Sequence, residues 1–230
     1  MSHRTTMNSS NSNHDFPRFS GHAGAELEVL TVHQNHRGFA QRFVSGLSRR
    51  LFTRLLRSRF AEFGHGSFID GPAWIRGGES ISVGKGVQIW RASRFDVVNA
   101  EVGRTVIEIG DGVVLNPSIR ISGAKSVQIG PGVGISSNCF ITDNDHYSVD
   151  PTVSAVANSH VIAAPTSIGA HAWIGEKACV LKGVTIGKHS IVGAGSVVVH
   201  AVPPISIAAG VPARVIKSWC HDTNRWVPAS

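Results

Sequence analysis

The chain has 230 residues, of which 42% are hydrophobic and 16% charged, and its net charge is +7 at pH 7. This length is enough for one domain with a sizeable core and a short appendage. No apolar run is long enough to span a membrane and no apolar signal core opens the chain, so we expect a cytoplasmic protein.

The cysteines and the charge narrow the classes of partner. Cys139, Cys179 and Cys220 are odd in number and have no metal-binding spacing, which favours reduced thiols over a disulfide framework. The positive charge suits an anionic partner, but the chain has no nucleic-acid-binding motif. We therefore expect no nucleic acid, and a phosphate-bearing small molecule or an anionic membrane surface remains.

Two segments precede the main domain. Residues 1–36 are polar, rich in Ser, Asn and His, and lack periodicity, which predicts a disordered or loosely held tail. Residues 37–62 have a helical stripe of Phe and Leu flanked by arginines. Two interpretations of this basic amphipathic helix stay open: a cap on the main domain, or contact of residues 37–60 with the anionic inner membrane surface. The stripe comprises Phe39, Phe43, Leu47, Leu51 and Leu55, and the arginines are Arg42, Arg49, Arg50, Arg54 and Arg57.

From residue 63 to residue 217 an aliphatic residue recurs at every sixth position. A chain that turns a corner every six residues makes a triangular coil in about eighteen, and stacked coils pair as parallel strands. The aliphatic residue points inward, a small residue two positions earlier fits beside the corner, and a following glycine permits the corner's backbone angles. We therefore predict an all-β protein, a parallel β-helix of hexapeptide repeats, with a tail over 218–230. One run begins Ile69, Ile75, Ile81 and slips by two to Val83; the longest is Ile168, Ile174, Val180, Ile186, Val192, Val198.

The longest interruption of the repeat, residues 142–167, predicts a loop extruded from the coil. Long loops on a rigid scaffold are typical of functional sites. Its beginning concentrates titratable groups. His146 there, one of twelve histidines in the chain, is either a general base or an ordinary histidine of a surface loop. A metal site of Asp143, Asp145 and His146 lacks a second ligand cluster elsewhere, so we expect no metal.

Four motifs carry a resemblance to a known family. They are "NDHY" (144–147), "AWIG" (172–175), "VLKGVTIGKHSIVGAGSVV" (180–198) and "VPPISIAAGVPARVIK" (202–217). In this order they resemble the hexapeptide-repeat acyltransferases, especially sugar O-acetyltransferases of the galactoside and maltose type and their relatives in polysaccharide and lipopolysaccharide biosynthesis. The resemblance implies a left-handed β-helix, a homotrimer with active sites between adjacent prisms, acetyl-CoA as acyl donor and a saccharide hydroxyl as acceptor.

The resemblance also assigns roles around the reacting hydroxyl. His146 matches the family's general base, and Asn116 matches an asparagine that contacts the acceptor near that hydroxyl. Asp143, Asp145 and Tyr147 flank the base and are expected to bind the substrate. The implied mechanism is direct transfer in a ternary complex, in which His146 takes the hydroxyl proton as the oxygen attacks the thioester.

A second group matches positions expected to bind acetyl-CoA. Trp173 matches a tryptophan that packs beside the site in the family. Ala194 matches a position whose backbone binds the pantetheine arm. Arg214 and Lys217 match a basic tail near the CoA phosphates. The tryptophan also fits a trimer-interface aromatic, and the basic pair also fits solvated charges. At the position of Val199 the family often has threonine, so a side-chain hydrogen bond to CoA is lost in this chain. These residues are Trp173, Gly175, Ala194, Val199, Arg214 and Lys217.

Two other functions stay open, and a third is disfavoured. The same scaffold serves N-acetyltransferases of amino sugars or antibiotics, and non-catalytic β-helix modules used for binding or assembly. A metal-dependent hydratase of the carbonic-anhydrase type needs interfacial histidines at a spacing that this sequence lacks. Cys139, two residues before Ile141, is expected to be a core residue and no nucleophile.

Overall fold

The computed structural model describes residues 19–20, 26–27, 39–147, 152 and 160–229. The chain divides into two units, Met1–Phe39 and Ala40–Ser230. In the first, β1 (Phe19–Ser20) pairs antiparallel with β2 (Glu26–Leu27). The rest of the predicted N-terminal tail lies outside the described residues.

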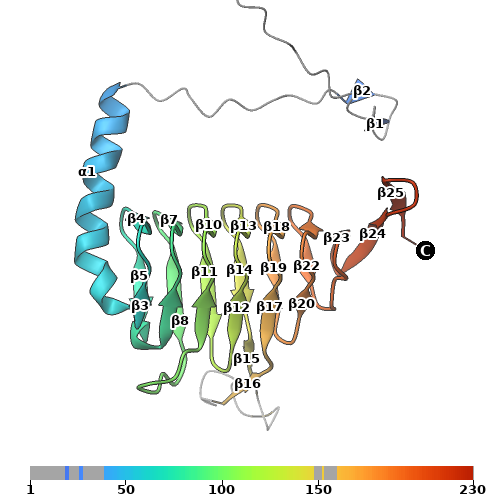
Figure 1. The fold of residues 1–230 in the computed structure, drawn as a ribbon. Helices are drawn as coiled ribbons and strands as arrows, with labels where there is room; N and C mark the ends of the chain where they lie inside the picture. Colours follow the sequence, from blue (N-terminus) through green and yellow to red (C-terminus); the bar gives the residue numbers. More distant parts are fainter. Residues whose placement is uncertain (1–18, 21–25, 28–38, 148–151, 153–159, 230) are drawn as a thin grey trace, which may run out of the picture. The chain divides into compact units, whose positions relative to one another are not determined.

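The second unit contains a prism with three walls of parallel strands, shown in Figure 1. The chain passes from wall I to wall II to wall III and back, so each coil contributes one short strand to each wall. Wall I holds β3 (Glu62–Phe63), β6 (Ile81–Val83), β9 (Ile107–Ile109), β12 (Val127–Ile129), β17 (Thr166–Ile168) and β20 (Thr185–Ile186). Wall II holds β4 (Phe68–Asp70), β7 (Gln88–Trp90), β10 (Val114–Leu115), β13 (Gly134–Ile135), β18 (Trp173–Ile174), β21 (Ile191–Val192) and β23 (Ser206–Gly210). Wall III holds β5 (Trp74–Arg76), β8 (Arg94–Val97), β11 (Arg120–Gly123), β14 (Phe140–Thr142), β19 (Cys179–Val180) and β22 (Val197–Val198).

The inward aliphatic residues of successive coils are register partners, as the period of six predicts. On wall II, Ile89 pairs with Leu115, then Ile135, Ile174 and Val192, and all five are completely buried. Each such side chain stabilises the prism by about 1.5–3 kcal/mol relative to an exposed one. The predicted all-β coil is therefore confirmed.

One member of the predicted repeat sits in another row. Ile81 pairs with Ile107, whereas Val83 pairs with Ile109 on the main ladder. The slip of two residues therefore occurs before Val83, and Ile81 fills the inward row that lies two residues earlier in the coil. It is still completely buried.

The predicted reason for the glycine after each ladder residue is wrong. Gly169 and Gly175 do not have positive φ; the left-handed residues stand two positions later, at His171 (φ 58°) and Lys177 (φ 61°). A Cβ at Gly169 would stand 2.5 Å from the backbone nitrogen of Lys188, and one at Gly175 would stand 2.5 Å from that of Ala194. Glycine is required there because the next coil passes too closely for any side chain.

Helix α1 (Phe39–Leu56) and the 3₁₀ turn η1 (Arg57–Arg59) occupy the region predicted as helical over 37–62. Phe52 and Leu56 pack against the core, and the Thr53 hydroxyl accepts a hydrogen bond from the Ile69 amide at 2.9 Å. The helix therefore covers the first coil, as the cap interpretation predicts. No helix in the described part of the chain is long and apolar enough to cross a membrane.

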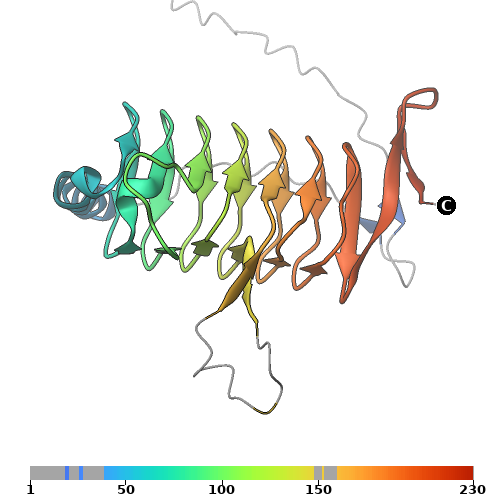
Figure 2. The same ribbon diagram turned by 90° about the horizontal axis from the view of Figure 1, so that it is seen from below.

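Two features leave the regular coil. After β14 the chain forms an antiparallel hairpin of β15 (Asn144–His146) and β16 (Val161–Ala163), which projects from the prism in Figure 2. Residues 148–151 and 153–159 of the predicted loop lie outside the described residues. The segment predicted as a tail over 218–230 instead contains β25 (Arg225–Pro228), which pairs with β24 (Ala213–Cys220). The Trp219 and Trp226 rings are half-buried and pack edge to face across that pair, which stabilises the two strands.

Candidate active site

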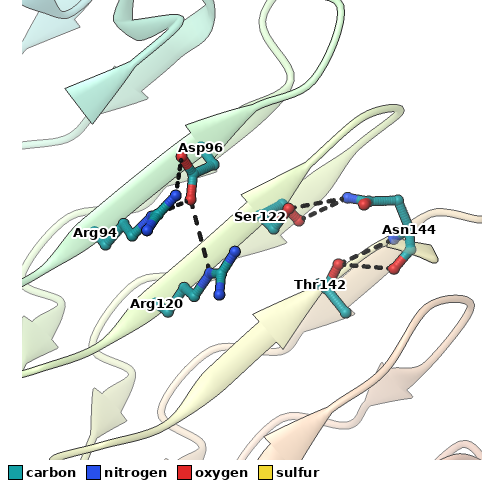
Figure 3. Close-up of polar contacts among 6 residues, drawn as sticks. All are labelled: Arg94, Asp96, Arg120, Ser122, Thr142 and Asn144. Atoms are coloured by element: carbon teal, nitrogen blue, oxygen red, sulfur yellow. Dashed lines mark hydrogen bonds and ion pairs between the residues drawn. The ribbon is translucent and has the colours of Figure 1, made fainter. Parts of the chain in front are cut away.

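The hairpin carries His146 at the corner between walls III and I. His146 is exposed and lies opposite Val161 in the antiparallel pair. Two residues earlier, Asn144 is fixed to the prism, as Figure 3 shows. Its side-chain amide donates to the Ser122 hydroxyl at 3.2 Å and its backbone amide donates to the Thr142 hydroxyl at 3.1 Å. The imidazole is therefore carried on a short strand whose first residue, Asn144, is anchored to the prism.

Asp143 is a buried residue that fixes the start of the hairpin to the prism. Its carboxylate is completely buried and accepts hydrogen bonds from the backbone amides of Ala124, Lys125 and Ser126 at 2.8, 2.7 and 2.5 Å. The Asn144 amide adds a fourth donor at 2.9 Å. This geometry gives no support to the prediction that Asp143 binds substrate, because the side chain cannot reach solvent. It locks the turn between β11 and β12 to the start of the hairpin.

The other two residues predicted to bind substrate remain at the surface. Asp145 pairs with Lys182 of the following coil at 2.8 Å, with 59% of the aspartate side chain exposed. Tyr147 is 45% exposed, and its backbone amide donates to the His160 carbonyl at 3.0 Å. The ion pair ties the outer part of the hairpin to the prism, and the phenol remains accessible.

Some of the residues predicted to bind acetyl-CoA lie at a different corner from His146, the one between walls II and III. Gly175 follows β18 and Ala194 follows β21, so both stand at the corner between walls II and III. Arg214 is exposed and is paired with Ala209, which follows the last inward residue of wall II.

Trp173 is 47% exposed on wall II, where a Cβ at Gly134 would stand 2.6 Å from its ring. Lys217 is exposed on β24, whereas Val199 follows β22 and stands at the corner between walls III and I.

Asn116 lies at the corner between walls II and III, and His146 lies at the corner between walls III and I. Asn116 follows β10 at the corner between walls II and III, where its side chain donates to the Ile135 carbonyl at 3.1 Å. His146 follows β14 at the far edge of wall III. One copy of the chain therefore does not bring its predicted base next to its predicted acceptor-contacting asparagine.

The outer surface of wall III holds a charged cluster that the sequence analysis missed. Arg94 and Arg120 are register partners, and both contact the nearly buried Asp96, with nitrogen–oxygen distances of 2.5 and 3.7 Å. The hydrogen bond and charge of Asp96 raise the pKa of Arg94. Figure 3 shows this cluster beside the Ser122–Asn144 contact. The available signal was an arginine directly before the inward residue in two successive coils.

The thiol of Cys139 is a core group, as predicted. It is 1% exposed and lies 3.1 Å from the Gly175 carbonyl oxygen, and burial raises its pKa. A protonated buried thiol is a poor nucleophile. Within the described residues, no three His, Cys, Asp or Glu side chains are grouped to hold a metal ion.

Comparison with known proteins identifies the class of this scaffold. Residues 165–200 match the family model "Bacterial transferase hexapeptide (six repeats)", and the prism is a left-handed parallel β-helix. The putative lipopolysaccharide biosynthesis O-acetyl transferase WbbJ of Escherichia coli is 35% identical over 69% of this chain and 82% of its own length. The chain therefore belongs to the hexapeptide-repeat acyltransferase family.

Two further likenesses agree with this assignment. Galactoside O-acetyltransferase of Escherichia coli is 28% identical over 71% of this chain and 66% of its own length. The structure of AntD, an N-acyltransferase from Bacillus cereus in complex with dTDP and 3-hydroxybutyryl-CoA, superposes with a TM-score of 0.63. It is 22% identical and covers 76% of this chain and 92% of that one, a level that shows the shared fold alone.

Proposed function

We propose that the protein transfers an acetyl group from acetyl-CoA to a hydroxyl of a saccharide, with His146 as general base. The observation that carries this is the anchored "NDHY" hairpin in a member of an acyltransferase family. Asp143 and Asn144 fix the start of the hairpin with hydrogen bonds, while His146 stays exposed two residues after Asn144. The names of relatives at 35% and 28% identity, both O-acetyltransferases, favour oxygen as the acceptor atom.

The chemistry assigned to His146 is simple and balanced. The imidazole accepts the hydroxyl proton as the oxygen attacks the thioester carbon, and the CoA thiolate leaves and takes up a proton. A thiolate is a good leaving group, so catalysis depends on activating the hydroxyl and holding it close to the thioester. We assign acetyl-CoA to the corner of Gly175 and Ala194, with the exposed Arg214 and Lys217 near its phosphates.

The separation of the two corners supports a site shared between copies. Asn116 and His146 lie at opposite edges of wall III. If three copies turn wall III toward a common axis, the Asn116 corner of one copy meets the His146 corner of the next. Such a homotrimer has three equivalent sites, each completed by two copies.

At the level of β17 to β22, the outward residues of walls I and III agree with this arrangement, whereas earlier coils of wall III carry the charged cluster of Arg94, Asp96 and Arg120. In two neighbouring coils, the outward residues of wall I are Ser167 and Thr185, which are polar. At the same level, the outward residues of wall III are Cys179 and Val197, which are half-buried and apolar. Apolar surface beside polar surface is typical of an oligomer interface.

The test is an assay of free CoA thiol with acetyl-CoA and a panel of saccharides, followed by product analysis. We expect thiol release only with an acceptor, and a product whose acetyl group is removed by mild alkali because it is an ester. An alkali-stable amide formed from an amino sugar would favour the N-acetyltransferase alternative. Failure to bind either acetyl-CoA or CoA in calorimetry would favour a non-catalytic module.

A further inference from the structure

Helix α1 has an inner face that is fixed to the prism. Arg49, Phe52, Thr53 and Leu56, spaced as i, i+3, i+4 and i+7, are all partly buried. Arg49 pairs with the buried Asp70 at 3.1 Å, and its guanidinium lies 4.4 Å from the centre of the Phe68 ring. These contacts set the rotation of the helix about its axis, and therefore determine which residues face away from the prism.

The opposite face of the helix exposes a stripe of leucines. Leu47, Leu51 and Leu55 are 63%, 52% and 59% exposed, and their spacing of four places them in one row. Single exposed leucines are common at protein surfaces, but a contiguous row marks a docking surface. The cap role therefore explains only the inner half of the helical pattern.

Arginines occupy the flank between this stripe and the prism. Arg50, Arg54 and Arg57 are exposed, and the ion pairs formed within the described residues include none of them. With Arg49, Thr53, Ser67 and Phe68 they line a pocket of ≈ 640 Å³ that has no acidic residue in its lining. A pocket with several arginines offers hydrogen-bond donors suited to phosphate oxygens.

We propose that this outer α1 surface (Leu47, Leu51, Leu55, Arg50, Arg54 and Arg57) docks on an anionic phospholipid surface. The leucines enter the boundary between headgroups and acyl chains, and the arginines bind lipid phosphates. A row of apolar side chains flanked by cations is the pattern of a helix lying in that plane, and the absence of acidic side chains from the pocket supplies the charge complementarity. Cap and membrane contact are therefore two faces of one helix.

The position of the helix favours contact by several copies at once. In Figure 1, α1 lies across one end of the prism. Copies packed side by side with parallel axes present their outer α1 surfaces to the same plane, which multiplies weak individual contacts. The docking itself does not depend on acetyl transfer, so its test is separate from that of the proposed function.

The experiment is cosedimentation of the full chain with vesicles of equal parts phosphatidylglycerol and phosphatidylcholine, and with vesicles of phosphatidylcholine alone. We expect binding to the first, weak binding to the second, and weakening by salt. Replacing Arg50, Arg54 and Arg57 together by Gln should lower the partition coefficient at least about tenfold, since each cation near an anionic surface contributes about fivefold. Leu47, Leu51 and Leu55 replaced together by Gln should lower it comparably, without loss of helix, because Gln is a good helix former.

Matched controls use exposed residues away from α1. A variant with Arg104, Lys125 and Arg225 changed to Gln loses the same charge and should keep most of its binding. Val102, which is 95% exposed, changed to Gln controls for lost apolar surface. If the intact chain does not bind phosphatidylglycerol vesicles, or if both α1 variants bind like the intact chain, the proposal is wrong. If the intact chain does not bind vesicles and the leucine variant also lowers the oligomeric state in light scattering, the outer α1 surface binds a second copy of the chain and the proposal is wrong.

Discussion

At the scale of single residues, the hairpin carries two exposed histidines, of which only His146 is the predicted general base. His146→Ala should lower kcat by about 100- to 10,000-fold, the range for loss of a general base, with little change in the KM for acetyl-CoA. His160→Ala removes a histidine from the other side of the same hairpin and should leave kcat nearly unchanged. Steady-state kinetics between pH 6 and 9 distinguish them, and near-normal turnover by the His146 variant would contradict the mechanism.

The two aspartates of the hairpin base should differ sharply in stability. Asp143→Asn removes the charge and points an amide donor at backbone donors, so it should lower the free energy of unfolding by about 2–4 kcal/mol. Asp145→Asn breaks only the exposed pair with Lys182 and should cost at most about 1 kcal/mol. Denaturant titrations at one protein concentration measure both, and equal effects would show that the buried network matters less than its geometry indicates.

Cys139 should give a pH-dependent contribution to stability. Burial raises its pKa in the folded protein above the ordinary 9.0, so the folded state favours the protonated thiol. That contribution is fully present below pH 9 and is lost as the pH rises through the raised pKa, at no more than about 1.4 kcal/mol per pH unit. The difference in Tm between the intact chain and Cys139→Ala should therefore be constant up to about pH 8.5 and shrink above pH 9. A difference that stays constant to pH 10.5 would contradict the raised pKa.

At the scale of elements, glycine has opposite roles in the coil and in the helix. Gly169→Ala should destabilise strongly, by at least about 2 kcal/mol, because its Cβ would meet the backbone of the next coil. Gly46→Ala in α1 should stabilise by about 0.5–1 kcal/mol, because nothing lies within 4 Å of the added methyl group and alanine favours helix. Thermal unfolding of the two variants measures the contrast, and a mild effect at Gly169 would show that neighbouring coils can separate locally.

At the scale of the whole molecule, the walls of the prism should differ in their tolerance of charge. Cys179→Asp together with Val197→Asp places two charges on wall III, and should convert the expected trimer into monomers with little acetyl transfer. Ser167→Asp together with Thr185→Asp places the same charges at the same level on wall I, and should leave assembly and activity intact. Light scattering at micromolar concentration reads both variants, and a monomeric intact chain would contradict shared sites.

The amino-acid sequence by itself determined the coil. The period of six, the inward aliphatic residues and the small residues beside the corners are local regularities, and a solenoid buries each coil only against its neighbours. Residues such as Ile135 and Ile174 are 39 positions apart but need only the repeat to become partners. The position of His146 at the largest break in the repeat was equally visible, because an interruption is a local property of the sequence.

Only the tertiary structure decided what depends on distances between coils. It turned Asp143 into a buried support, because its three backbone donors come from a turn 17–19 residues earlier. It changed the reason for the glycines, because a backbone 2.5 Å from a missing Cβ cannot be read from one coil. It also placed Asn116 and His146 at opposite edges of wall III and turned Leu47, Leu51 and Leu55 away from the prism. A sequence pattern fixes which residues share a face, but which face meets a neighbour is set by packing between elements.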